Sequence, residues 1–167
     1  MKTYILTGAS DGLGESFAKL CLKNNINIIA LCRNKPDYKC EFINTDLSDK
    51  DSIINSCNLI KEKYSKFDAI VNCAGTMSLQ STDSLSFEEM EYVYKVNTIS
   101  PLFITSMLLP LIKENKADIF NVVSIMGTMF DIEEQSVTYT SSKWGLRRCD
   151  YQYSIRTKRV SLQSNYI

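Results

Sequence analysis

Histidine is absent from the 167-residue chain. Its absence excludes Ser-His-Asp triads, Cys-His proteases, HExxH zinc sites and any imidazole base. The chain also has no net charge, because 19 basic residues balance 19 acidic residues. A neutral chain offers no electrostatic attraction for nucleic acid or for an anionic membrane, so we expect neither as a partner.

Glycine and proline are scarce, with six and three residues, and the six cysteines form no CxxC pair. No cysteine spacing resembles a zinc site, and we predict no metal. We interpret the thiols as reduced and mostly buried, which indicates a cytoplasmic protein. The apolar stretch at the N-terminus is too short for a signal peptide. Residues 99–112 are too few and too often interrupted by polar residues to cross a bilayer.

Apolar residues make up 44% of the chain and charged residues 23%, which is typical of one globular domain, here residues 1–167. Short apolar runs alternate with segments of helical periodicity. The runs that predict strands are 4–6, 26–31, 40–44, 67–71 and 119–123. The segments that predict helices are 13–22, a second around 53–60 that Asp46 or Ser48 caps, and a long one over 87–113 that Pro101 bends.

Strands that are apolar on both faces and alternate with helices indicate a parallel sheet that is covered on both sides. The expected fold is therefore a doubly wound α/β domain, Rossmann-like, with three α/β/α layers. Such folds bind ligands at the carboxyl ends of their strands.

A glycine-rich turn, residues 7–14, follows the first predicted strand. Gly8 would allow the tight turn, Gly12 would let the backbone approach a pyrophosphate, and Gly14 would let the helix pack close to the sheet. The amino end of the helix would then offer its free N–H groups to phosphates. An ordinary glycine loop is the alternative, but the strand before the turn and the helix after it favour a dinucleotide site.

Tyr139 and Lys143 are four residues apart, so they share one face of a helix. A nearby ammonium stabilises a phenolate, and such a tyrosine can donate or accept a proton near neutral pH. Ser124 follows the last predicted strand, where its hydroxyl could bind a carbonyl. Asn97 lies inside the long predicted helix, where it could interrupt the helix and hold a water. Taken singly, each has a structural alternative: a solvated helix face, a turn serine and a surface amide.

Taken together, the chain resembles the short-chain dehydrogenase/reductase family over residues 2–145. The resemblance rests on the glycine turn, Asp46-Leu47, Asn72-Cys73-Ala74-Gly75, Val96-Asn97-Thr98, Asn121-Val122-Val123-Ser124, and Tyr139 to Lys143. It implies a catalytic set of Asn97, Ser124, Tyr139 and Lys143. Tyr139 would be the general acid or base, Lys143 would assist it and bind the nicotinamide ribose, Ser124 would orient the substrate, and Asn97 would hold a relay water.

The resemblance also implies a nicotinamide dinucleotide and a small carbonyl or alcohol substrate, and it is compatible with a homodimer or homotetramer. Cofactor contacts would come from the turn (Gly8, Ser10, Asp11, Gly12, Leu13 and Gly14), from Asp46 and Leu47 at the adenine, and from Asn72, Ala74 and Gly75, together with Tyr139 and Lys143. Arg33 stands where an acidic residue would select NAD, so we expect NADP(H) to be preferred, with NAD(H) possible. Asp11, a negative charge in the glycine turn, argues against this preference.

After residue 145 the sequence departs from the family pattern. We expect residues 147–167 to be divergent and poorly ordered, the family's last strand and substrate lid to be missing, and the chain to be a truncated member. The function that we predict is an NADP(H)-dependent oxidoreductase. The alternative is a catalytically inactive remnant that binds the nucleotide.

Overall fold

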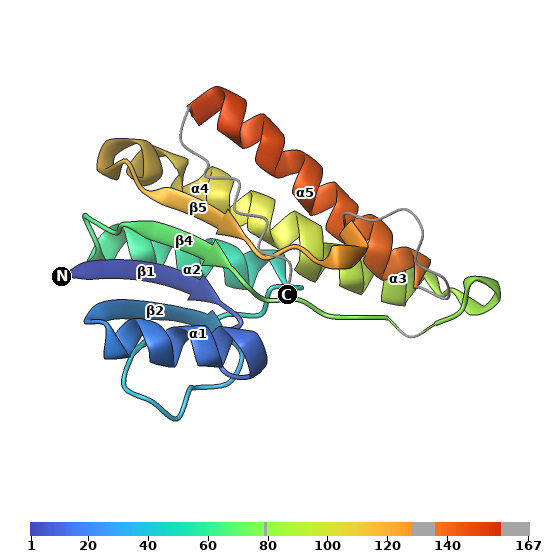
Figure 1. Cartoon of the computed structure of the whole chain (residues 1–167), viewed down its shortest axis with the longest axis horizontal. Coiled ribbons are helices and arrows are strands. Elements are labelled where there is room, and N and C mark those ends of the chain that lie inside the picture. The colour runs from blue at the N-terminus through green and yellow to red at the C-terminus, as the bar shows by residue number, and fades with distance from the viewer. Residues whose placement is uncertain (79, 128–135, 158–167) are drawn as a thin grey trace.

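The computed structural model describes residues 1–78, 80–127 and 136–157. Helices and strands alternate along the chain (Figure 1). The strands are β1 (Lys2–Thr7), β2 (Ile26–Cys32), β3 (Glu41–Asn44), β4 (Ala69–Asn72) and β5 (Asp118–Asn121). The helices are α1 (Gly12–Lys23), α2 (Lys50–Lys63), α3 (Phe87–Tyr94), α4 (Ser100–Asn115) and α5 (Val137–Thr157), with short turns η1 (Thr82–Ser84), η2 (Lys95–Ile99) and η3 (Ile125–Gly127).

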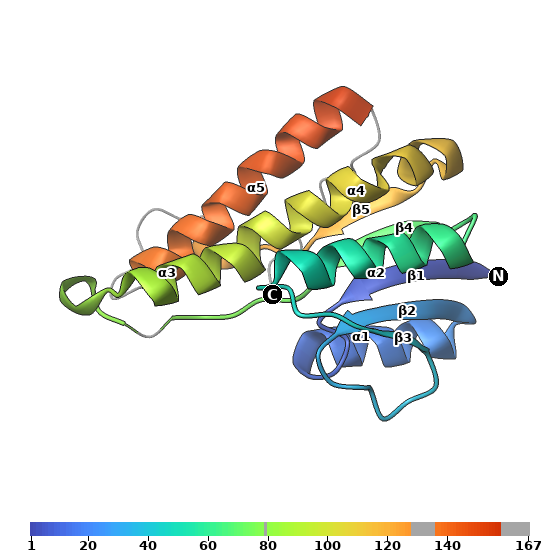
Figure 2. The same cartoon turned by 180° about the vertical axis from the view of Figure 1, so that it is seen from behind.

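The strands form one parallel sheet in the order β3-β2-β1-β4-β5. The order reverses between β1 and β4, which is the switch point where doubly wound folds bind ligands. α1 covers one face of the sheet, and α2 and α4 cover the other, as the views from the two sides show (Figures 1 and 2). The predicted three-layer doubly wound fold is confirmed by this arrangement.

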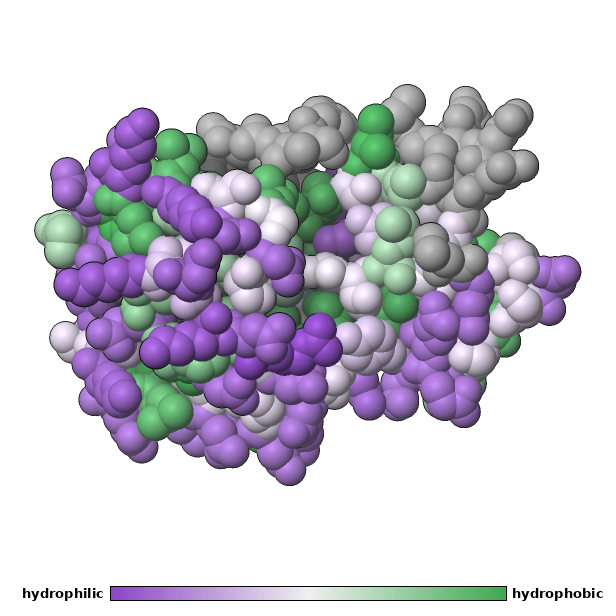
Figure 3. Space-filling view, turned by 90° about the horizontal axis from the view of Figure 1, so that it is seen from below, coloured by the Kyte–Doolittle hydropathy of each residue, from purple (hydrophilic) through white to green (hydrophobic). Residues whose placement is uncertain are grey.

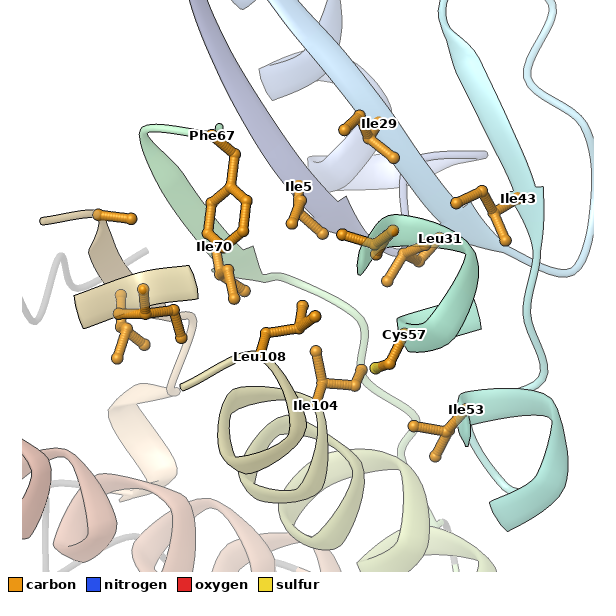
Figure 4. Close-up of a cluster of buried hydrophobic side chains, with 14 of the residues drawn as sticks. Ile5, Ile29, Leu31, Ile43, Ile53, Cys57, Phe67, Ile70, Ile104 and Leu108 are labelled. Carbon is orange, nitrogen blue, oxygen red and sulfur yellow. The ribbon is translucent and has the colours of Figure 1, made fainter. Parts of the chain in front are cut away.

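Successive residues of each strand contribute to opposite layers of the core. Ile5, Ile29 and Leu31 pack with α2 and α4 in one apolar cluster, which Figure 4 shows. Leu6, Ile28 and Ala30 pack with α1 in a second cluster. Because side chains alternate across a strand, strands that are buried on both faces must be apolar at every position. This is why the fully buried stretches, residues 28–32 of β2 and 69–71 of β4, are unbroken apolar runs.

The helix predicted over 87–113 is interrupted before Pro101. It consists of α3, a π-helical turn at Lys95–Ile99 and α4. A π turn inserts an extra residue into the helix, and such turns are frequent at functional sites. The interruption therefore lies at Asn97 itself.

Among the described residues, the stretch Phe87–Asn115 is the one helix whose length and composition would let it cross a membrane. Half of its most apolar window is buried inside the fold, as expected for a core helix. The molecular surface seen in Figure 3 is largely hydrophilic, with apolar patches between the polar residues.

The predicted cap of the second helix is wrong. Asp49 occupies the cap position, and its carboxylate accepts a hydrogen bond from the Asp51 N–H at 3.0 Å. Asp46 lies three residues earlier and closes the turn before the helix, where its carboxylate accepts bonds from the N–H and the hydroxyl of Ser48, at 2.8 and 2.7 Å. At the other end of the chain, α5 continues to Thr157. The prediction for residues 158–167 lies outside the described part of the chain.

Candidate active site

A cavity of about 450 Å³ opens at the carboxyl ends of β1, β2, β4 and β5. It is lined by thirteen of the residues singled out from the sequence: Gly8, Ser10, Asp11, Leu13, Gly14, Arg33, Asp46, Leu47, Ala74, Gly75, Ser124, Tyr139 and Lys143. Gly12, Asn72 and Asn97 do not line it. Residues from segments as distant as the glycine turn and α5 therefore meet at one sheet edge.

The glycine turn between β1 and α1 is fixed by close backbone contacts. Gly8 has a φ of +69°, and a Cβ on it would lie 2.7 Å from Cα of Ala74. A Cβ on Gly14 would overlap the carbonyl oxygen of Gly8. Any larger side chain at either position would therefore push the turn open. The hydroxyl of Thr7 accepts bonds from the N–H groups of Cys73 and Ala74, at 3.0 and 3.1 Å, which joins this turn to the loop after β4.

The amino end of α1 faces the cavity through Leu13 and Gly14. Asp11 is the N-cap residue, but its side chain makes no cap hydrogen bond. The side chain of Asp11 therefore leaves the first N–H groups of the helix to other acceptors. A Cβ on Gly12 would meet no atom within 4 Å. Ser10, Asp11, Leu13 and Gly14 of this turn line the cavity, so the turn is accessible to a ligand there, as a phosphate-binding turn requires.

Lys143 is almost fully buried, with 3% of its surface exposed. Its ammonium donates a hydrogen bond of 3.0 Å to the carbonyl of Val122, just after β5. Burial lowers the pKa of Lys143 from 10.5 to about 8, and the neighbouring Cys73 thiol opposes this shift. The ammonium lies 5.9 Å from the centre of the Tyr139 ring. The predicted Tyr139–Lys143 pair thus lies on one face of α5, as four-residue spacing on a helix demands.

Small residues make room for Lys143. A Cβ on Gly75 would stand 3.2 Å from its ammonium nitrogen, and a Cβ on Gly127 would stand 3.0 Å from its backbone oxygen. The scarce glycines after β4 and β5 therefore let two loops approach this one lysine.

Asn97 lies behind the cavity wall and is fully buried. Its amide bonds both backbone groups of Thr76, accepting from N–H and donating to C=O at 2.8 Å each. Its second N–H donates to the hydroxyl of Ser142 at 3.0 Å, and that hydroxyl donates to the carbonyl of Tyr139 at 2.7 Å. Asn97 therefore connects the loop after β4 to the helix that carries Tyr139 and Lys143.

Asn72 is also buried beneath the site, at the end of β4. Its amide donates to the side-chain oxygen of Asn121 on β5 at 2.6 Å, while its own side-chain oxygen has no partner among the described residues. The bond ties together the ends of the two strands that support the cavity wall.

Arg33 and Asp46 lie at the other end of the cavity. Hydrogen bonds from Ser48 lower the pKa of the Asp46 carboxyl, and the Arg33 charge adds to this effect. Arg33 follows β2 and Val122 follows β5, three strand spacings apart in the sheet. At about 4.8 Å per spacing, the Arg33 and Lys143 ends of the cavity are separated by about 14 Å.

The other residues that line the cavity were given no role from the sequence: Leu31, Cys32, Thr45, Cys73, Thr76, Met77, Tyr92, Val96, Val122 and Val123. Most of them lie inside a motif quoted above or next to one, so the position of each strand end is the signal that could have found them. Tyr92 gives no such signal, because it comes from α3.

The family model that describes short-chain dehydrogenases matches residues 2–150. The chain belongs to this family. Among the short-chain dehydrogenases, an uncharacterized oxidoreductase of Staphylococcus saprophyticus is 26% identical over 156 residues, which are 85% of this chain and 66% of the relative. The chain spans between 56% and 66% of the length of the first curated relatives that it matches.

Solved structures of other dehydrogenases agree with the fold. The structure of 4-hydroxyisoleucine dehydrogenase complexed with NADH has a TM-score of 0.84 and 24% identity, and the match covers 93% of this chain and 69% of that one. The alcohol dehydrogenase from the archaeon Thermococcus sibiricus, complexed with 5-hydroxy-NADP, has a TM-score of 0.86 and 20% identity, with coverage of 96% and 73%. At these identities the likeness supports the fold alone.

Proposed function

We propose that this chain is an oxidoreductase that transfers a hydride between NADP(H) and a carbonyl or secondary alcohol. One observation carries the proposal: the buried ammonium of Lys143 lies beside the Tyr139 ring, in the same cavity that the glycine turn and the amino end of α1 border. A proton donor and a phosphate-binding turn at one sheet edge are what dinucleotide-dependent reduction needs.

The residues present fit a nicotinamide dinucleotide. When bound, such a cofactor supplies or accepts the hydride. The pyrophosphate would meet the N–H groups at the start of α1, which the Asp11 side chain leaves uncapped. Leu47 would border the adenine, and Ala74 and Gly75 would border the middle of the cofactor. The nicotinamide ribose would meet Lys143.

The expected preference for NADP(H) depends on Arg33. Arg33 is a cation at the far end of the cavity from Lys143, where a 2′-phosphate would lie. The Asp46 carboxylate, which the Arg33 charge reaches, accepts two hydrogen bonds from Ser48, which satisfy part of its charge. Asp11 is the opposing charge in the turn. Because the negative charge of Asp11 would repel a 2′-phosphate, NAD(H) remains the second candidate cofactor.

In the reduction direction, Tyr139 would donate its phenolic proton to the substrate oxygen while Ser124 holds that oxygen by a hydrogen bond. Lys143 would remain largely protonated at pH 7, since its pKa is about 8, and would stabilise the phenolate that forms. Both N–H groups of the Asn97 amide are already used. A relay water held by this side chain would therefore have to donate to its oxygen.

The experiment that tests the proposal is a titration of the purified chain with NADPH and NADH, followed by the fluorescence of the bound dihydronicotinamide. Tighter binding of NADPH supports the cofactor assignment. A panel of carbonyl substrates then tests turnover. Tyr139→Phe should lower turnover by about 10² to 10⁴-fold, the range for loss of a general acid, with cofactor binding nearly unchanged.

Three outcomes would contradict parts of this proposal. Binding of neither cofactor would refute it altogether. Retained turnover in Tyr139→Phe would refute the proton transfer. Cofactor binding without reduction of any carbonyl would favour the alternative, a nucleotide-binding protein without turnover.

We also propose a cytoplasmic location and self-association. Cys21, Cys32 and Cys57 are buried, and burial raises the pKa of each thiol, that of Cys57 to about 11. Buried, unreactive thiols of this kind are typical of proteins in a reducing compartment. Phe87 and Ile99 expose apolar side chains along the outer surface of the α3–α4 run, which favours a homodimer or homotetramer. Light scattering of the purified chain would test the assembly, and a monomer at micromolar concentration would contradict it.

A further inference from the structure

Tyr92 on α3 lines the cavity at the same end as Arg33. Its hydroxyl accepts a hydrogen bond from a terminal nitrogen of the Arg33 guanidinium at 3.4 Å. The two residues are 59 positions apart and come from elements on different sides of the cavity, the end of β2 and helix α3. The contact therefore joins two distant segments of the chain within the lining of the cavity.

The Arg33 side chain is exposed. An exposed arginine has many rotamers, and fixing one of them costs about 2 kcal/mol of side-chain entropy. Its backbone is held by Asn44, whose amide donates to the Arg33 carbonyl at 2.6 Å, but that bond leaves the guanidinium free to turn. The Tyr92 hydroxyl is the hydrogen-bond partner of the guanidinium, and the Asp46 carboxyl, which the Arg33 charge also reaches, is its charged neighbour in the same cavity wall.

A tyrosine hydroxyl can accept and donate at once. In the Arg33 contact it uses an oxygen lone pair, so its proton can point to an oxygen of an anion held by the guanidinium. The ring is half-buried and packs on the edge of the apolar core cluster of α2 and α4, which fixes the hydroxyl in place. A phosphate between the two residues would meet two donors from two directions.

We propose that Tyr92 is a specificity-determining residue that holds Arg33 in place and binds the 2′-phosphate of NADP(H) with it. The inference rests on the proposed function, because it assumes that a nicotinamide dinucleotide occupies the cavity. It adds a residue whose position in the sequence gives no hint of the role. NAD(H) lacks the 2′-phosphate, so Tyr92 should contribute nothing to its affinity through the hydroxyl.

The test is the ratio of the NADPH and NADH dissociation constants for four proteins: the unmodified chain, Arg33→Ala, Tyr92→Phe and the double variant. Tyr92→Phe removes the hydroxyl and keeps the ring, so the wall of the cavity is unchanged. Tyr64→Phe is the matched control, because its hydroxyl bonds Glu41 at 3.3 Å on the surface, outside the cavity.

We expect Arg33→Ala to weaken NADPH by about 10 to 100-fold, the range for a lost hydrogen bond to a charged group. Tyr92→Phe should weaken NADPH by about 3 to 10-fold, as for the loss of one neutral donor, and leave NADH unchanged. In the Arg33→Ala background the same change should have a smaller effect, because the two residues act as a unit. Tyr64→Phe should alter neither constant.

The outcomes separate this inference from the proposed function. If Arg33→Ala leaves the ratio unchanged, the NADP(H) assignment itself fails and the inference falls with it. If Arg33→Ala changes the ratio but Tyr92→Phe does not, the inference alone is overturned. Equal weakening of both cofactors by Tyr92→Phe would make Tyr92 a packing residue and would also overturn it.

Discussion

Replacing the buried Lys143 with methionine tests the electrostatic character of the site without any ligand. Methionine keeps most of the length and apolar volume of the side chain and removes the charge. The ammonium in the folded protein has a pKa of about 8, against 10.5 for an exposed lysine. A lysine with a lowered pKa is harder to protonate in the folded chain than in the unfolded chain, so its charge opposes folding.

The sign of the pH dependence follows from proton binding. Between pH 8 and 10.5 the unfolded chain binds more protons at this lysine, so the stability of the unmodified protein rises with pH there. At about 1.36 kcal/mol per unit of pKa difference, the cost of the charge is about 3 kcal/mol at pH 7 and below about 1 kcal/mol at pH 10. Lys143→Met removes this cost but also the hydrogen bond to Val122, a loss of about 1 to 3 kcal/mol at either pH.

At pH 7 the two effects nearly cancel, so a single measurement would be ambiguous. The change in this stability difference between two pH values is unambiguous, because the loss of the hydrogen bond contributes equally at both. We expect the free energy of unfolding of Lys143→Met, relative to the unmodified protein, to fall by about 2.5 kcal/mol from pH 7 to pH 10. Urea denaturation followed by far-UV circular dichroism measures it. Lys66→Met, at an exposed position, is the control, and a pH-independent difference for Lys143→Met would refute the reasoning.

Two further predictions concern the turn and the buried amide network. Gly14→Ala should abolish NADPH binding and cost about 1 to 3 kcal/mol of stability, since its Cβ would overlap the Gly8 carbonyl. Gly145→Ala is the control and should be neutral or stabilising, because the nearest atom to its Cβ is 3.4 Å away. Equal effects of the two variants in a thermal melt would contradict the steric argument. Ser142→Ala should cost about 1 to 3 kcal/mol, because a buried donor loses its acceptor. Ser106→Ala, on the exposed surface of α4, should cost almost nothing, and a similar loss in both variants would show that the network contributes no stability.

The order and type of the elements followed from apolar periodicity, because β2 and β4 are buried along most of their length and the helices are buried on one face. The strand predicted over residues 26–31 and the observed β2 (Ile26–Cys32) differ by one residue. The cap of α2 could not be predicted from sequence alone. Asp46, Ser48 and Asp49 are all good cap residues, and only the fold shows that Asp46 bonds Ser48 while Asp49 bonds the Asp51 N–H.

The candidate site was predictable where its residues belong to local motifs, and not where they meet only in the fold. The glycine turn and the Tyr139–Lys143 spacing are visible in the sequence. The contact of Tyr92 with Arg33 joins α3 to the end of β2, 59 positions away in the sequence, and no local pattern encodes it. The hydrogen bonds of the Asn97 side chain to Thr76 and Ser142 likewise form only in the folded chain. They occupy both N–H groups of the amide, so a water could bind this side chain only through its oxygen.

The burial of Lys143 links the fold to its proposed chemistry. Gly75 and Gly127 come from two different loops, and each brings backbone within contact distance of this residue. Such packing removes water from an ammonium, which costs stability, and a core chosen for stability alone would hold an apolar side chain there. The same burial strengthens the attraction between the ammonium and any phenolate at Tyr139, because water no longer screens it. The energetic cost to the fold and the benefit to proton transfer therefore have one cause, and Lys143→Met should remove both together.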